Sequence, residues 1–209
     1  ANRLDRSLLF GVPAFAGLSG AELDDVLSGA GARRYAKGAA VFEQGAAAGF
    51  FFVLLDGRLK VVQTTPAGHQ IVVRFVNPGE LFGIAAVIGR DDYPATAVAA
   101  IESVALAWEM RAWPLLVGRY PAIAGNALRT VGARLQESHT RIREMSTERI
   151  ERRIAHALLR LAQQAGHRTD AGVAIGFPIS RQDIAEMTAT TLHTVSRVMS
   201  SWEQDGIVD

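Results

Sequence analysis

The sequence contains no cysteine, which excludes disulfides, thiolate zinc sites, cysteine-ligated iron–sulfur clusters and cysteine nucleophiles. Long apolar runs are lacking too: the longest, AAAGFFFVLL at 46–55, is stopped by Asp56 and is too short to cross a bilayer. Neither charge dominates, with 22 Lys and Arg against 21 Asp and Glu. Any contact with nucleic acid must therefore come from a local patch. We expect a cytoplasmic protein that does not associate with a membrane.

Sequence motifs of catalysis are also missing. The chain has no nucleophile elbow, no P-loop, no HExxH and no carboxylate pair suited to acid–base work. Glu22, Asp24 and Asp25 are most simply the solvated face of a helix. The sequence therefore predicts a protein that is not an enzyme.

The first half of the chain has the texture of a short helix followed by a small β-structure. In residues 17–30, Ser19 is followed three residues later by Glu22, a capping-box pattern that predicts a helix. From 35 to about 108, short apolar runs alternate with turn residues. The turns are Asp56-Gly57, Ala67-Gly68 and Asn77-Pro78-Gly79. This pattern predicts a small antiparallel barrel or roll.

A long helical segment follows, with a heptad pattern along one side. Its members are Leu128, Val131, Leu135, Ser138, Ile142 and Met145. Their steps alternate between three and four residues, the 3.5-residue period of a coiled-coil seam. Two interpretations stay open: an amphipathic helix packed on its own domain, or a two-stranded dimer helix, which the length and period favour. We predict a break at 145–147, with Ser146 or Thr147 capping a new helix.

The end of the chain has the spacing of a helix-turn-helix. Ser180 and Asp183 form a short capping box, and Ala189 stands in the turn where Gly is common. Thr190 or Thr191 can cap the second helix. We expect Leu192, Val195 and Val198 to bury one face of that helix.

The other face of this second helix carries His193, Ser196 and Arg197. Arg can donate two parallel hydrogen bonds to guanine O6 and N7, and Ser and His can bond base edges or phosphate. Our candidate DNA contacts are Ser180, Arg181, Gln182, Thr190, Thr191, His193, Ser196 and Arg197. A solvated helix face is the simple alternative, and the complete helix-turn-helix spacing favours DNA readout. A small-molecule-binding module with a partner-binding tail would instead expose apolar anchors.

Several segments, taken in their order along the chain, resemble the CRP/FNR family of bacterial transcription regulators. The resemblance rests on FAGLSGAELDDVL, GAAVFEQG, FFFVLLDGRLKVV, PAGHQIVVRFVNPGELFG, YPATAVA, RIERRIAHALLRLA and ISRQDIAEMTATTLHTVSRVMSSWEQDGIV. It implies an α+β fold with a cyclic-nucleotide-binding-like β-roll, a long dimerisation helix and a winged helix-turn-helix. The implied domains are an effector-sensing domain over 1–118, a dimerisation helix over 119–146 and a DNA-binding domain over 147–209. The wing is expected beyond Asp209.

Two positions depart from the members that bind cyclic AMP. Those members carry a Glu after the Gly of their FGE motif and an Arg-Ser or Arg-Thr pair for the cyclic phosphate. Here Ile84 follows Gly83, and Pro94-Ala95 replaces the pair. A cyclic phosphate would lose its charge-assisted hydrogen bonds, so cyclic AMP is not the expected effector. The candidate effector positions are Gly79, Glu80, Gly83, Ile84, Ala95 and Thr96.

The cysteine-free chain looks most like the nitric-oxide-responsive branch that includes NnrR and DNR. That resemblance implies control of denitrification genes and a haem cofactor. No motif singles out an axial ligand among the five histidines; His69 and His139 are the candidates, and His167 is expected in a loop. The resemblance also implies a homodimer on palindromic double-stranded DNA of the TTG…CAA type, and contact with RNA polymerase.

Overall fold

The structure, a computed structural model, describes residues 5–209. The predicted 1–118 domain begins with four residues that lie outside this range. The chain divides into two compact units, one made of residues up to 61 with 75–136 and the other of 62–74 with 137–209. Within the described range, no helix is both long and apolar enough to cross a membrane.

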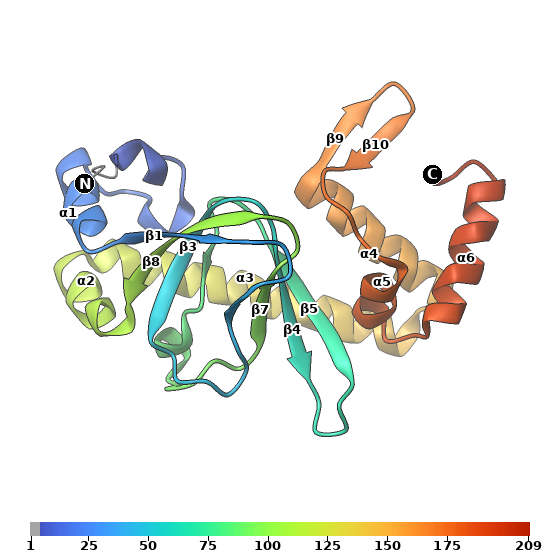
Figure 1. Ribbon diagram of the computed structural model, residues 1–209, viewed down its shortest axis with the longest axis horizontal. Helices are drawn as coiled ribbons and strands as arrows, with labels where there is room; N and C mark the ends of the chain where they lie inside the picture. Colours follow the sequence, from blue (N-terminus) through green and yellow to red (C-terminus); the bar gives the residue numbers. More distant parts are fainter. Residues whose placement is uncertain (1–4) are drawn as a thin grey trace. The chain divides into compact units, whose positions relative to one another are not determined.

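The first part of the chain is the expected antiparallel β-structure (Figure 1). Two 3-10 turns, η1 (Arg6–Leu9) and η2 (Pro13–Phe15), precede helix α1 (Gly20–Ser28). The strands are β1 (Gly31–Tyr35), β2 (Ala40–Phe42), β3 (Phe50–Asp56), β4 (Leu59–Thr64), β5 (Gln70–Val76), β6 (Leu81–Phe82), β7 (Thr96–Ala99) and β8 (Ser103–Glu109). They form two four-stranded sheets, ordered β1-β8-β3-β6 and β2-β7-β4-β5.

The predicted capping box and turns of this part are confirmed. Ser19 caps α1, and Glu22 bonds back to the Ser19 backbone. The expected turn at Gly57 has φ +90°, and a Cβ there would lie 2.4 Å from the Glu102 carbonyl oxygen. Only glycine fits that close approach, so Asp56-Gly57 fixes the β3–β4 connection.

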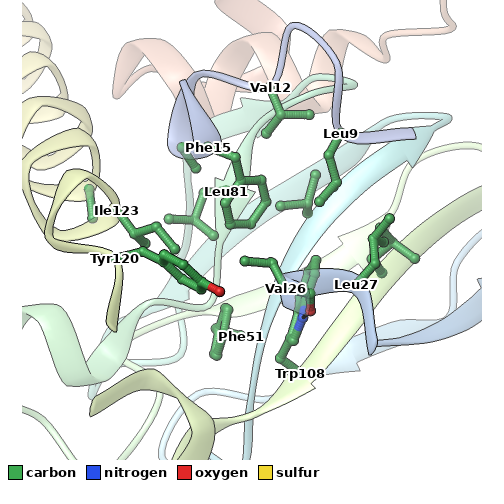
Figure 2. Close-up of a cluster of buried hydrophobic side chains, with 14 of the residues drawn as sticks. Leu9, Val12, Phe15, Val26, Leu27, Phe51, Leu81, Trp108, Tyr120 and Ile123 are labelled. Atoms are coloured by element: carbon green, nitrogen blue, oxygen red, sulfur yellow. Dashed lines mark hydrogen bonds between the residues drawn. The ribbon is translucent and has the colours of Figure 1, made fainter. Parts of the chain in front are cut away.

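One apolar core joins α1, the β3–β8 pair and the start of the long helix (Figure 2). Trp108 stacks on Phe51 with ring centroids 5.4 Å apart, and its indole N–H donates to the Val26 carbonyl over 2.8 Å. Ile123, fully buried, brings the long helix into the same cluster. The indole nitrogen is thereby satisfied in a buried site, where an unpaired donor would be costly.

The helices after the β-structure are α2 (Trp113–Arg119) and α3 (Pro121–Thr147), the long helix predicted from the heptads. Buried Asn126 donates to the carbonyls of Ala14 and Ala16, each over 3.0 Å, and so ties α3 to the chain's first turns. The expected cap at Ser146 or Thr147 is wrong. Both hydroxyls donate back to carbonyls one turn earlier, and α3 continues through Thr147.

The last unit contains α4 (Ile150–Ala165), β9 (Gly166–Thr169), β10 (Gly172–Ile175), α5 (Arg181–Thr188) and α6 (Leu192–Gln204). Arg149 is the N-cap of α4. His167, expected in a loop, lies in the β9–β10 hairpin, which follows α4 directly (Figure 1). Ile154, Ile184 and Val195 meet in the core of α4, α5 and α6. The wing expected beyond Asp209 stays a prediction.

Candidate functional site

Helix α5 begins with the predicted capping box. The Ser180 hydroxyl accepts from the Asp183 backbone N–H over 3.0 Å, and the Asp183 carboxylate accepts from the Ser180 backbone N–H over 3.1 Å. Two N–H groups that the helix leaves unpaired are satisfied in this way. The start of α5 is therefore fixed by its own side chains.

The turn between α5 and α6 is held in an unusual backbone conformation. Ala189 has φ +50° and ψ 50°, and it is the one non-glycine residue with a positive φ in the described part of the chain. Ala185, 2% exposed, leaves room for α6 to approach, and its carbonyl accepts from the Thr190 N–H over 3.1 Å. A small residue at each position lets the two helices cross closely.

Helix α6 is capped by Thr191, whose hydroxyl accepts from the Thr194 N–H over 3.2 Å. Val195 and Val198 are buried as expected. The expectation for Leu192 is wrong, because its side chain is 47% exposed. Leu192 is the first residue of α6, and Met199 and Trp202, further along the helix, pack against the core instead.

The face of α6 opposite its buried valines is polar and has no partners among residues 5–209. His193 and Arg197 are exposed, and Ser196 is half-buried. The part of the chain described here offers none of these three side chains a hydrogen bond or an ion pair. Three side chains that can donate hydrogen bonds thus lie in the N-terminal half of α6, while buried valines fix its other face. Readout of DNA bases requires this arrangement.

Two candidate contacts on α5 are engaged within the protein. The Arg181 guanidinium pairs with Glu203 of α6, Nη2 to Oε1 2.8 Å, and the Gln182 amide donates to Glu186 over 2.8 Å. Ser180 is exposed and Thr190 half-buried. The structure therefore gathers the sequence-predicted contacts along the start of α5, the turn and α6, while two of them already have carboxylate partners.

Helix α3 carries the predicted heptad stripe on its surface. Leu128, Leu135 and Ile142 are 68%, 53% and 61% exposed, and Met145 is 37% exposed. Val131 is half-buried against the β-structure core, and Ser138 is exposed. Four large apolar side chains thus lie along one helix without cover in a single chain, which marks an interaction surface.

Two arginines hold the other side of α3. Arg134 donates to the Leu81 carbonyl and Arg141 to the Val73 carbonyl. Burial lowers the pKa of Arg141, with nearby Arg160 adding to the effect. The two arginines stand one heptad apart, so they fix which face of α3 looks away from the strands.

The positions proposed for an effector are filled or locally bonded. Ile84 and Ala95 are buried, 7% and 9% exposed, and Ile84 belongs to the apolar core. Glu80 accepts from the Asn77 N–H over 3.2 Å, and the Thr96 hydroxyl accepts from the Gln44 N–H over 3.0 Å. Of the two positions where cyclic-AMP binders carry charge, Ile84 is apolar and buried, and Pro94 is apolar and exposed.

Aromatic side chains occupy the region around Gly83. A Cβ at Gly83 would lie 2.9 Å from the Phe52 ring, and Phe52 stacks on Phe82 at 5.0 Å. Phe42 stacks on Tyr93 at 3.9 Å. The Tyr93 hydroxyl donates to the Phe50 carbonyl over 2.6 Å, and burial raises the Tyr93 pKa. Gly79, with φ +82°, closes the preceding turn.

An open cavity of about 440 Å³ lies elsewhere, at the start of the chain. It is lined by Arg6, Leu9, Phe10, Gly11, Val12, Pro13, Phe15, Ala16, Gly17, Leu18, Gly20 and Leu23. None of the candidate effector positions and no histidine or methionine is among these residues. Arg6, its one charged side chain, pairs with Asp24 over 3.0 Å.

None of the five histidines is buried as the axial ligand of a haem would be. His69 and His139 are exposed, and neither lines the cavity. His156 lies 3.3 Å from the Glu144 carboxylate. A haem needs an axial ligand inside an apolar pocket, and no histidine is so placed in residues 5–209. Across the same range, no three His, Cys, Asp or Glu side chains gather as a metal site.

Comparison with known proteins decides the family. A cyclic nucleotide-binding domain model matches residues 32–120, and a Crp-like helix-turn-helix domain model matches residues 152–209. The "Cyclic AMP receptor protein" of Thermus thermophilus is 30% identical over 198 residues, covering 95% of this chain and 88% of that protein. The chain belongs to the CRP/FNR family of transcription regulators.

Solved structures of this family share the fold. FixK2 from Bradyrhizobium japonicum has a TM-score of 0.74 at 20% identity, covering 85% of this chain and 86% of that one. The sensor domain of the transcriptional regulator DNR from Pseudomonas aeruginosa is a more partial match. It has a TM-score of 0.56 at 26% identity and covers 65% of this chain and 91% of that one. The resemblance to the CRP/FNR family and the expected β-roll with a helix-turn-helix are thus confirmed.

Proposed function

We propose that this CRP/FNR-family regulator acts as a homodimer on palindromic DNA in the cytoplasm and controls nitrogen-oxide genes in response to nitric oxide. The observation that carries DNA reading is the polar face of α6, where His193, Ser196 and Arg197 stand exposed or half-exposed above buried Val195 and Val198. DNA binding follows from membership of the family. The homodimer, the palindromic site and the response to nitric oxide are what we propose.

Arg197 is the proposed reader of a guanine in a TTG…CAA half-site. Its guanidinium has no partner among the described residues and can donate a bidentate pair to O6 and N7. His193, four residues earlier on the same face, takes the neighbouring base step. A neutral His offers one acceptor, so it selects a different base from the Glu of oxygen-sensing relatives. Ser180, Thr190 and Thr191 are the proposed phosphate contacts.

The stripe on α3 is the proposed dimer seam. Its apolar residues repeat at heptad spacing over most of a 27-residue helix, long enough for a two-stranded coiled coil. A two-fold pair of α3 helices would present two copies of α6, matching half-sites one DNA turn apart. An effector would then shift the balance between two arrangements of this pair, and bound dimers would recruit or block RNA polymerase.

The effector proposal rests on the ligands for which the β-roll has no binding partner and on the proteins that the β-roll resembles. Ile84 and the Pro94-Ala95 pair provide no charged partner for a ribose hydroxyl or a cyclic phosphate, which argues against cyclic AMP. The branch that the sequence resembles suggests nitric oxide, and the sensor domain of DNR, a member of that branch, shares the fold. Since no histidine is placed to hold a haem, regulation by a different small molecule is the second candidate.

The test is a gel shift on a TTG…CAA palindrome at rising salt, run with haemin and then nitric oxide under anaerobic conditions. Sequence-specific binding that weakens steeply with salt supports the readout. A stoichiometric Soret shift, with DNA binding that appears only after nitric oxide, would establish a haem sensor despite the present geometry. Specific DNA binding without saturable haem uptake would leave the second candidate.

A further inference from the structure

The DNA-binding part of the chain has few cations. Residues 147–209 contain seven arginines, no lysine and eight acidic side chains. Within α5 and α6 the arginines are Arg181 and Arg197. If Arg197 reads a base, Arg181 is the one cationic side chain of these two helices left for the phosphate backbone, which supplies most of the affinity of such proteins.

Arg181 stands where the first helix of a helix-turn-helix meets the backbone. It is the first residue of α5, directly after the Ser180 cap. The first helix crosses the DNA backbone, and helix N-termini approach phosphates. Asp183 already occupies the cap through its carboxylate, so Arg181 is the group at this end that can attract a phosphate.

In the free protein this guanidinium is paired with Glu203. Nη2 lies 2.8 Å from Oε1, and the two side chains are 40% and 41% exposed. Glu203 follows Ser196 by seven residues, which is within about 20° of two full helical turns and about 10 Å along the axis. The carboxylate is thus on the same row of α6 as a residue of the reading face, and a bound phosphate would compete with it.

We propose that Glu203 acts as an internal competitor of the DNA phosphate, so that Arg181 exchanges its carboxylate for a phosphate when the protein binds DNA. The pair is open to solvent, so the exchange needs no unfolding, and Nε and Nη1 stay available to an incoming phosphate. The carboxylate therefore lowers affinity for all DNA sequences equally. The proposal rests on DNA binding by α5 and α6 and not on nitric oxide or the palindrome.

The experiment measures fluorescence anisotropy of the full chain on a labelled duplex of arbitrary sequence, about three helical turns long, at several salt concentrations. Glu203→Gln should tighten binding about two- to fivefold per protomer, the scale of an exposed ion pair that no longer has to be broken. Arg181→Met should weaken binding and flatten the slope of log K against log salt by about 0.9 per protomer.

The double variant decides between partner exchange and simple charge repulsion. In the Arg181→Met background, Glu203→Gln should have no effect if the two groups act through each other. An equal gain in both backgrounds, or weaker binding by Glu203→Gln alone, would overturn the proposal. Glu151→Gln, a matched charge removal at an exposed site on α4, should leave affinity unchanged. Circular dichroism and the unfolding midpoint verify the fold of each variant.

Discussion

Helices α3 and α6 are both amphipathic and both leave one face uncovered in a single chain, but the two faces have opposite chemistry. On α3 the uncovered side chains are apolar, with Leu128 at 68% and Ile142 at 61% exposure. On α6 they are His193 and Arg197, while the apolar residues Val195 and Val198 face inward. An apolar stripe is stabilised by leaving water, whereas a row of unpaired donors is suited to base edges.

The two helices also differ in what fixes them. Apolar burial holds the start of α3, and polar anchors add to it, since Asn126, Arg134 and Arg141 donate to backbone carbonyls. Apolar burial and a threonine cap hold α6. Each helix is thus fixed on its inner side by contacts within the chain, which leaves its other face uncovered. The comparison predicts two separable functions, assembly by α3 and reading by α6.

The largest expected effect is a charge in the α3 stripe. Leu135→Glu should give monomers, because a two-fold seam would bring two buried carboxylates together. Affinity for a palindrome should fall by about 100-fold or more, since two linked half-site contacts become independent. Light scattering and a gel shift measure the two effects.

The matched control for the stripe is Gln136→Glu, which adds the same side chain at the next, exposed position of α3. It should leave both assembly and DNA affinity intact. If the Leu135→Glu protein stayed dimeric, the α3 stripe would not be the dimer interface, and α3 would pack only within its own chain.

The next effect concerns reading by α6. Arg197→Ala should cost about 1–3 kcal/mol on a site with the cognate guanine, and binding-site selection should lose its guanine preference at that step. The dimer should persist, which separates the two helices. Arg149→Ala, at an exposed arginine just before α4, should keep the preference. A selection without guanine dependence in the wild type would contradict the assignment of Arg197.

A smaller effect concerns the support of α6. Val195→Ala should destabilise the chain by about 2 kcal/mol, because Val195 is fully buried among α4 and α5 residues and its removal leaves a cavity. Leu192→Ala, one turn earlier on an exposed side chain, should change stability by less than about 0.5 kcal/mol. Denaturant unfolding followed by circular dichroism measures both. Equal losses would mean that Leu192 is covered in solution.

The error at Leu192 shows where sequence reasoning reaches its limit. Spacing predicts the capping boxes at Ser19 and Ser180, a cap at Thr190 or Thr191 and the turn at Ala189, because each depends on neighbours within a few residues. Helical periodicity says which residues share a face. It does not say where along the helix the covering partner ends.

The other differences have the same origin. Ser146 and Thr147 are typical caps, but their hydroxyls bond carbonyls of the preceding turn, and α3 extends past them. The β9–β10 hairpin was missed because strand β9 is exposed throughout and shows no alternation of buried and exposed residues. The pairing of Arg181 with Glu203 joins residues 22 positions apart, which no local pattern reveals. The dimer seam and the effector stay predictions because each needs a second molecule.

The smallest expected effect lies in the turn that sets how α6 is presented. Ala189 has φ +50°, a left-handed conformation that costs a residue with a Cβ about 1 kcal/mol and costs glycine almost nothing. Glycine is also more flexible when unfolded, which offsets part of this gain. Ala189→Gly should therefore raise stability by about 0.5 kcal/mol, seen as a small rise in the unfolding midpoint, with DNA affinity unchanged. Ala171→Gly, in the exposed β9–β10 connection where φ is negative, should lower stability slightly instead. If Ala189→Gly were destabilising, the left-handed turn would be absent in solution, and the angle at which α5 supports α6 would have to differ.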